Sequence, residues 1–394
     1  MRKLRRASTR KLMALCLAIV GVLAVGVAIA NAIGTSGSPP PPKPLPQAVH
    51  GALTAPSPVG ITARISYTSR LVNSSLMTEH TSPLLKGGSG RLWVAQGGKL
   101  RIELQSDRGD SQVISDGHRF LLTDPSSHTV YTGAIPQHRE RRAHGEHAPS
   151  LAEITKGLGR LERFAHVLGP GRGVVAGRPA YSVRVEPRNN KGLFGGVGGA
   201  WDAVRGVPLR LSVYAKGVSA PVIELHATNI SYGPVPASTF NVSIPKNSRV
   251  HTLATGRGNR GLHRSGNRHE QKAQGLAAVS KALSFKLVAP DQLAGEPRTE
   301  AHLIDSHGSP AAVVAYGKPL LGGLVVIERK VGKSKAGADR SGTSNLPHVK
   351  IGGVDATELS TPLGTLVSFE RGGVSYTVIG SVAKSKAEAA AQGL

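Results

Sequence analysis

Residues 90–125 read GRLWVAQGGKLRIELQSDRGDSQVISDGHRFLLTDP, and this stretch decides the fold. Within it, residues 100–105 (LRIELQ) alternate apolar and polar side chains without a break. Alternation with a period of two is typical of a β-strand with one buried and one solvated face. Asp116-Gly117 favours a tight hairpin, because glycine accepts a positive φ angle. We therefore predict a meander of antiparallel strands, a kind of sheet that can leave one face open.

The order of motifs in this stretch resembles the core of the LolA-type lipoprotein carriers and the related RseB-type periplasmic sensors. Gly90-Arg91-Leu92-Trp93-Val94 is similar to the Gly-x-Leu-Trp-Val strand of those families. Val113-Ile114-Ser115-Asp116-Gly117 is similar to their hairpin, which ends at a turn like Asp124-Pro125. The resemblance covers residues 90–125 throughout and extends more weakly over residues 48–250. It implies a mainly β (α+β) fold: a half-open antiparallel β-barrel with covering helices, whose concave side binds acyl chains.

One turn departs from the carrier pattern. Carriers of this type often have an arginine after the Trp-Val strand, which helps to hold the lid shut, whereas this chain has Gln96-Gly97. The departure speaks against a carrier-type latch and rapid hand-over. It favours the resemblance to the RseB-type sensors, in which a larger and a smaller domain together restrain a membrane partner. A third interpretation, a module that binds cell-wall or other anionic polymer, stays open.

The composition is strongly basic and poor in aromatic residues. Lysine and arginine number 49 against 24 acids, which gives a formal net charge of +25. Such an excess favours anionic partners, including an anionic membrane surface. Aromatic residues make up only 4% of the chain, which argues against a surface that stacks nucleobases. We therefore expect no nucleic-acid partner.

The N-terminal segment has the pattern of an export signal. Residues 2–11 are rich in lysine and arginine without an acid, and residues 12–30 carry no charge. Nineteen helical residues span about 28 Å, roughly the thickness of a bilayer's hydrocarbon core. We predict one N-terminal transmembrane helix within residues 1–34, as a signal anchor or a signal peptide. The bulk of the chain is then extracytoplasmic, or secreted if cleavage follows Ala32.

The sequence gives no positive sign of catalysis or metal binding. The single cysteine, Cys16, lies in the apolar N-terminal run, so the exported part cannot use thiol chemistry or disulfides. Residues 138–147 contain histidines and acids, but the arginines among them would repel a cation, and we interpret this segment as a solvated loop. No serine-hydrolase, metalloprotease or P-loop motif occurs. We expect a non-enzymatic protein without cofactor or metal.

Two further segments bear on the predicted cavity. Ser150 and Glu153 form a capping-box pattern, and apolar residues then recur at helical spacing up to Leu168, before Gly169-Pro170-Gly171. An amphipathic helix here would cover the open face of the sheet. Residues 193–201 (LFGGVGGAW) lack a phosphate-loop pattern and are interpreted as a mobile apolar flap or an ordinary loop.

The predicted cavity would hold acyl chains of a lipoprotein or lipid by burying CH₂ groups, at about 0.8 kcal/mol each. Because pattern alone does not tell which face of a sheet points inward, each candidate can equally be an ordinary core residue. The candidate cavity residues are Ile65, Tyr67, Trp93, Ile102, Leu104, Leu161, Phe164, Phe194, Trp201, Leu209 and Leu211.

We expect a proline-rich spacer at residues 35–47, the carrier-like domain at 48–248, a basic disordered linker at 249–274 and a small α+β domain at 275–394. The linker either is a solvated spacer or attracts anionic lipids, at about 1 kcal/mol per basic residue. The role of the small domain is left open. The candidate residues for an anionic surface are Arg257, Arg260, Arg264 and Arg268.

Overall fold

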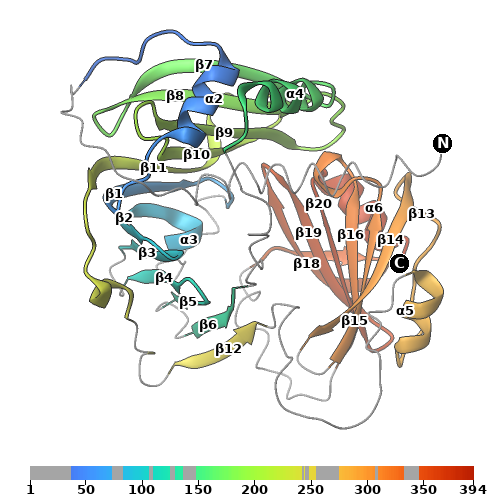
Figure 1. Cartoon of the computed structure of the whole chain (residues 1–394). Coiled ribbons are helices and arrows are strands. Elements are labelled where there is room, and N and C mark those ends of the chain that lie inside the picture. Colours follow the sequence, from blue (N-terminus) through green and yellow to red (C-terminus); the bar gives the residue numbers. More distant parts are fainter. Residues whose placement is uncertain are drawn as a thin grey trace, which may run out of the picture.

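The computed structural model describes residues 37–72, 83–105, 110–124, 129–135, 148–241, 244, 248–253, 275–306, 309–331 and 346–394. It contains two β-sheets with a few helices, and the larger sheet is curled and half-open (Figure 1). None of the helices in these ranges is long and apolar enough to cross a bilayer. The predicted transmembrane segment, the histidine-containing loop at 138–147 and the four candidate arginines of the linker lie outside the described residues.

The large sheet has twelve strands in the order β12-β6-β5-β4-β3-β2-β1-β11-β10-β9-β8-β7. Neighbouring strands are antiparallel except for β12, which pairs in parallel with β6. The strands are β1 (Gly60–Ser69), β2 (Gly87–Ala95), β3 (Lys99–Leu104), β4 (Ser111–Asp116), β5 (Arg119–Asp124), β6 (Thr129–Ala134), β7 (Ala165–Val175), β8 (Arg178–Pro187), β9 (Phe194–Asp202), β10 (Pro208–Ala215), β11 (Pro221–Tyr232) and β12 (Arg249–Leu253).

The predicted meander is confirmed as β2 to β5. Gly97 and Gly98 both have positive φ angles, 77° and 73°, at the turn between β2 and β3. In the next hairpin the Oδ1 atom of Asp116 accepts hydrogen bonds from the backbone N–H groups of His118 and Arg119, both at 2.7 Å. These bonds, the Arg119 bond most, lower the pKa of the Asp116 carboxyl. Local turn chemistry thus fixes the register of the strands.

Helix α4 (Leu151–Glu162) confirms the capping box but ends earlier than predicted. The Ser150 hydroxyl accepts from Glu153 N at 3.3 Å, and the Glu153 carboxylate accepts from Ser150 N at 2.9 Å. The chain then enters β7 at Ala165, so Phe164 and Leu168 are not on the helix. Residues 169–170 do not end a helix but lie at a register shift within β7, where a proline's missing N–H is tolerated.

The prediction of a flap or loop at residues 193–201 is wrong. This glycine-rich segment forms β9 in the interior of the sheet. Gly198 lies beneath the Tyr214 ring, because a Cβ atom there would come within 3.1 Å of it. The Arg184 guanidinium lies over the Tyr214 ring, 3.8 Å from the ring centroid. Gly198 therefore makes room for a neighbouring side chain and does not serve to make the segment mobile.

The proline-rich segment is likewise not a free spacer over its described part. The Tyr181 hydroxyl donates to the Pro41 carbonyl at 2.5 Å, and Arg172 Nη1 donates to the Pro40 carbonyl at 3.5 Å, so this segment lies against β7 and β8. Helix α2 (Leu45–Thr54) follows directly. The start of the predicted linker is also structured, as strand β12. Two short helices, α3 (Pro83–Lys86) and η2 (Ala237–Phe240), complete this part of the chain.

The small sheet has eight strands in the order β13-β14-β15-β16-β20-β19-β18-β17. Helix α5 (Leu276–Ala282) packs on β14, and helix α6 (Lys384–Gln392) packs on β19 and β20. The valines at its centre, Val314, Val326, Val367 and Val378, are completely buried. Its strands are β13 (Gln292–Leu293), β14 (Glu296–Ser306), β15 (Ser309–Tyr316), β16 (Leu324–Lys330), β17 (His348–Ile351), β18 (Val354–Thr361), β19 (Gly364–Arg371) and β20 (Val374–Gly380), and η3 (Pro319–Leu321) precedes β16.

Candidate functional site

An apolar row of side chains crosses one face of the large sheet from β2 to β6. The row has one residue on each strand, and each residue lies directly across from the one on the next strand. Its first residue, Leu92 of β2, also lies across from Ala63 of β1. All five side chains are only half-buried. Tyr131, at the far end, stacks on His251 of β12, with ring centroids 5.5 Å apart. We call this row, which consists of Leu92, Ile102, Val113, Leu122 and Tyr131, the apolar ladder.

The ladder begins where a closed core ends. Ile65, Leu104 and Leu209 are 2 to 4% exposed and belong to one cluster of buried residues. Tyr67 and Ile102 pack against that cluster but stay half-buried. The sheet is therefore filled around β1, β10 and β11, whereas the ladder side chains on β2 to β6 stay half-buried.

The two longer helices of this region cover the opposite end of the sheet. The main contacts of α2 and α4 are with each other and with β7, and Figure 1 shows both in front of β7 to β10. Leu45 and Ala48 of α2 form a second buried cluster with Tyr181 and Trp201. The predicted covering helices exist, but they cover the β7 end rather than the ladder.

The predicted cavity residues divide into three groups. Five are buried: Ile65, Leu104, Leu161, Trp201 and Leu209. Five are half-buried: Tyr67, Trp93, Ile102, Phe194 and Leu211. Phe164 is exposed, at 49%. The structure gathers Ile65, Tyr67, Ile102, Leu104 and Leu209 in one cluster and places Trp201 in the other.

Trp93 does not point to the same side as the ladder. Its register partners are Thr62 and Arg101, whereas its neighbour Leu92 pairs with Ala63 and Ile102. The Arg101 guanidinium lies 5.8 Å from the Trp93 ring centroid. Because adjacent residues of a strand point to opposite faces, the Trp-Val strand contributes Leu92, not Trp93, to the ladder.

Sequence reasoning identified Ile102 but missed the other four ladder members, Leu92, Val113, Leu122 and Tyr131. In β4 and β5 both faces are apolar, because Ile114 and Leu121 pair with each other behind Val113 and Leu122. Ile114 is buried, at 3%, on the side where η2 contacts β3 and β4. The alternation that identified β3 was therefore absent from the two strands that follow it.

A junction joins the large sheet to the small one where β8 turns into β9. The backbone N–H groups of Leu193 and Phe194 donate to the Ser381 hydroxyl at 3.1 and 2.8 Å. Lys191 N donates to the Leu321 carbonyl at 3.2 Å. A Cβ atom on Gly192 would lie 2.4 Å from the Ser381 carbonyl oxygen, so only glycine fits. The two sheets thus meet through close backbone contact.

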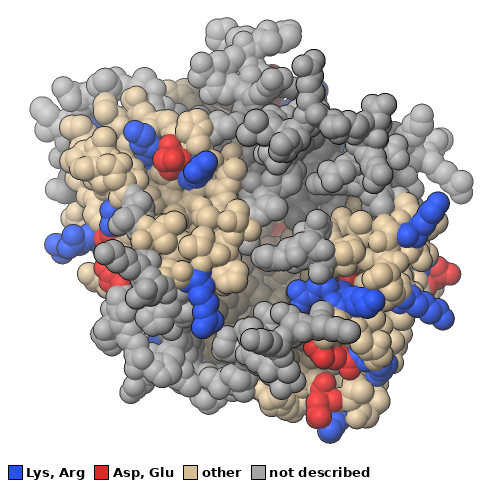
Figure 2. All heavy atoms as spheres, turned by 90° about the horizontal axis from the view of Figure 1, so that it is seen from below, with Lys and Arg blue, Asp and Glu red and all other residues tan. Residues whose placement is uncertain are grey.

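Metal ligands and charged side chains are two further features of the described residues. Within these ranges, no group of three or more His, Cys, Asp or Glu side chains is placed to hold a metal ion. The face seen in Figure 2 carries lysines and arginines on both sides of the view, and aspartates and glutamates lie beside several of them. The ladder itself offers apolar contact, which is non-directional.

Comparison with known proteins gives limited similarities. No family model matches the chain, and no curated protein matches it. A solved structure described as the complex structure of Pseudomonas aeruginosa MucA/MucB is 16% identical, with a TM-score of 0.42, and the match covers 88% of this chain and 95% of that one. A crystal structure of MucB in complex with MucA(peri) is also 16% identical, with a TM-score of 0.38 and coverage of 84% and 91%. A crystal structure of MucB is 16% identical, with a TM-score of 0.37, and the match covers 88% of this chain and 95% of that one.

Proposed function

We propose that this chain is an exported, membrane-tethered, non-enzymatic protein that holds acyl chains of a lipid or lipoprotein against the apolar ladder. The observation that supports the proposal is the ladder itself, five apolar side chains in register that remain half-buried. Contiguous accessible apolar surface in a soluble part of a protein marks an interaction site or a binding groove.

The dimensions and energetics of the ladder suit a long acyl chain. Four interstrand spacings of about 4.8 Å separate β2 from β6, roughly 19 Å in total. Each CH₂ group that is removed from water contributes about 0.8 kcal/mol, so a chain lying along the ladder gains affinity with its length. Apolar contact discriminates poorly between head groups, and we therefore expect the cargo to be selected by chain length.

The second candidate function is an RseB-like sensor that restrains a membrane partner, and the junction between the sheets favours it. Ser381, which directly follows β20 of the small sheet, holds the start of β9, a strand of the sheet that carries the ladder. A change of shape in the curled sheet on cargo binding would be passed to the small sheet through this contact. A carrier that only delivers cargo has no need for such a link.

Lipid extraction tests both functions at once. The full chain is purified, and its bound lipids are extracted and identified by mass spectrometry. We expect acyl lipids with the wild type, a several-fold loss with V113N/L122N, and no loss with the control Leu320→Asn, whose side chain is 52% exposed in η3, before β16. Wild-type protein that is reproducibly free of lipid would exclude the carrier and the sensor.

A transcription assay separates the two candidates. Deletion of the gene alters extracytoplasmic stress transcription if the protein is a sensor, and Ser381→Ala reproduces the effect by weakening the junction. If stress transcription is unchanged in both strains and the purified protein still binds lipid, the sensor is excluded and the carrier function is retained.

A further inference from the structure

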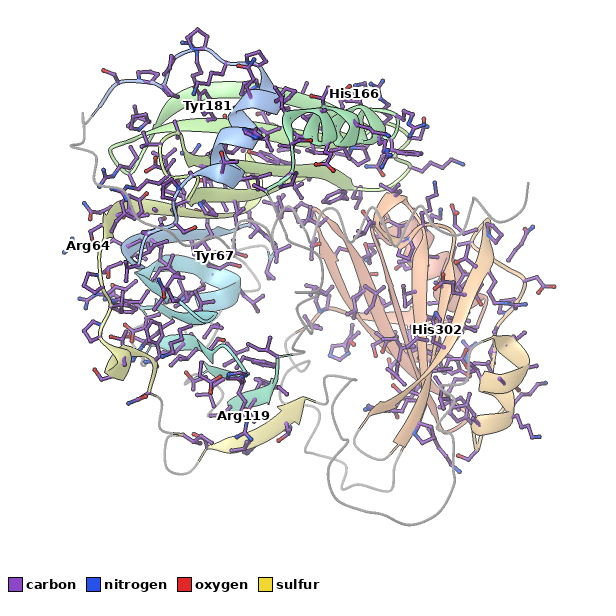
Figure 3. The ribbon with its side chains drawn as sticks, in the orientation of Figure 1. Arg64, Tyr67, Arg119, His166, Tyr181 and His302 are labelled. Atoms are coloured by element: carbon purple, nitrogen blue, oxygen red, sulfur yellow. The ribbon has the colours of Figure 1, made fainter. Side chains whose placement is uncertain are left out.

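A pocket lies on the side of the large sheet that faces away from the apolar ladder. Its side chains alternate along β1 and β2 with those of the ladder side, as Arg64 does with Ile65 and Arg91 with Leu92. In Figure 3 Arg64 lies at the left, on the side of the large sheet that is turned away from the small sheet. The pocket has a volume of about 360 Å³ and is lined by Thr62, Ala63, Arg64, Arg91, Trp93, Asn229 and Ser231.

Two arginines face each other in this pocket, and neither forms an ion pair with a described residue. Register places Arg64 directly across from Arg91 on one side and from Asn229 on the other. Like charges directly opposite each other in a sheet are destabilising. Across from Arg91 lies Glu103, whose carboxylate forms an ion pair with Arg101 instead. Within the described ranges, neither Arg64 nor Arg91 forms an ion pair, and both are exposed.

The backbone around the pocket is arranged to keep these groups together. A register shift between Arg64 and Ile65 marks a bulge, and the Thr228 hydroxyl donates to the Arg64 carbonyl at 3.3 Å. Bulges often re-aim a side chain beside a functional site. Around the two guanidiniums, the Thr62 hydroxyl and the Asn229 amide can donate further hydrogen bonds, and the Trp93 ring borders the pocket.

We propose that this pocket binds the phosphate group of an organic phosphate monoester. A phosphate monoester carries about −1.5 to −2 charges near neutral pH, which matches two guanidiniums, whereas a carboxylate would neutralise only one. Arginine's fork of N–H donors fits phosphate oxygens in bidentate geometry. The Trp93 ring offers a flat face to the organic part of the ligand. The site is independent of the acyl-binding function, because it lies on the other face of the sheet.

The test is calorimetric titration of the full chain with glucose 6-phosphate and with glucuronate, at about 0.15 M NaCl to screen non-specific attraction. We expect binding of the phosphate ester, and a dissociation constant raised about tenfold by Arg64→Gln and by Arg91→Gln, because each removes charge-assisted hydrogen bonds. Arg119→Gln is the matched control, since Arg119 is exposed on β5 far from the pocket (Figure 3), and we expect it to bind as the wild type does.

Three outcomes would overturn the proposal: no binding of glucose 6-phosphate by the wild type, equal binding of glucuronate, or equal losses in all three variants. Thermal unfolding without ligand shows whether the variants fold, and relief of the repulsion should leave Arg64→Gln at least as stable as the wild type. Vesicles containing phosphatidic acid, compared with phosphatidylcholine alone, distinguish the source of the phosphate. If the wild type binds the phosphatidic acid vesicles and the Arg64→Gln and Arg91→Gln variants do not, the phosphate belongs to a lipid head group. If the wild type binds only the soluble ester, the ligand is soluble.

Discussion

The small sheet and the β2–β6 half of the large sheet both place aliphatic side chains on one face, yet they bury them to different extents. In the small sheet Val314, Val326 and Val378 are completely buried, with α6 packed on neighbouring strands. In the large sheet Val113 and Leu122 stay half-buried. A sheet built only for stability covers its apolar face, as the small sheet does. The half-covered face of the large sheet is therefore the one to associate with binding.

The largest expected effect is on the stability of the small sheet. Leu324→Ala removes a side chain with no exposed surface and should lower the free energy of unfolding by about 2–5 kcal/mol. Leu122→Ala, in the ladder, should cost less, because its side chain is only half-buried. Urea unfolding of the full chain measures both. Equal losses of unfolding free energy would mean that the two apolar faces do not differ in how far their side chains are buried.

The second prediction concerns pH and Glu328 in the core of the small sheet. Burial raises the pKa of this carboxyl from 4.5 to about 7, although Val288 N donates to its Oε2 atom at 2.9 Å. The folded state therefore keeps a proton that the unfolded state loses. Stability is full below about pH 4.5, falls as the pH rises toward 7, and by linkage the loss is about 3 kcal/mol.

Urea midpoints measured across this pH range check the prediction. Glu328→Gln should make the urea midpoint of the small sheet independent of pH over this range. Glu370→Gln, an exposed control on β19, should keep the pH dependence of the wild type. An unchanged slope in Glu328→Gln would assign the pH dependence to other groups.

The third prediction tests the junction between the two regions. Gly192→Ala would place a Cβ atom 2.4 Å from the Ser381 carbonyl oxygen and should cost about 1–3 kcal/mol by overpacking. Gly173→Ala in β7 is the control, because nothing lies within 4 Å of its Cβ position. Hydrogen exchange of the Leu193 and Phe194 amides should speed up only in the first variant. Unchanged protection would show that the contact does not hold the sheets together.

Much of the fold follows from local signals. The alternation in residues 100–105 and the Asp116-Gly117 turn correctly predicted the meander, because both depend on nearby residues alone. Helix α2 carries Leu45, Ala48, Val49 and Ala52 at helical spacing, a signal that the adjoining prolines obscured. Gly198 of β9 was part of a run that indicated a loop, because the Tyr214 ring for which it makes room comes from a different strand.

The candidate site depends more on tertiary register than on local pattern. Whether Leu92 or Trp93 joins the ladder follows from the pairing of β2 with β1 and β3. The opposition of Arg64 and Arg91 likewise comes from two different strands, on which the two residues are 27 positions apart in the sequence. Neither pairing can be read from the residues of a single strand, because a shift of one residue reverses the faces.

The smallest expected effect is at the helical cover of the β7 end. Ser150→Ala removes the hydroxyl that accepts from Glu153 N and should cost about 1 kcal/mol, while Ser150→Thr should cost little. Thermal unfolding measures the loss. Because α4 packs on β7 and not on the ladder, lipid binding should be unchanged, and a loss of bound lipid would mean that α4 helps to cover the cargo.

Photo-crosslinking tests the role of the ladder most directly. The full chain is incubated with a diazirine-labelled long-chain fatty acid, irradiated, digested and mapped by mass spectrometry. We predict crosslinks at Leu92, Ile102, Val113, Leu122 and Tyr131, competed by unlabelled fatty acid. Crosslinks confined to the opposite face, around Trp93, or none above the level seen with V113N/L122N, would contradict the acyl-binding role of the large sheet.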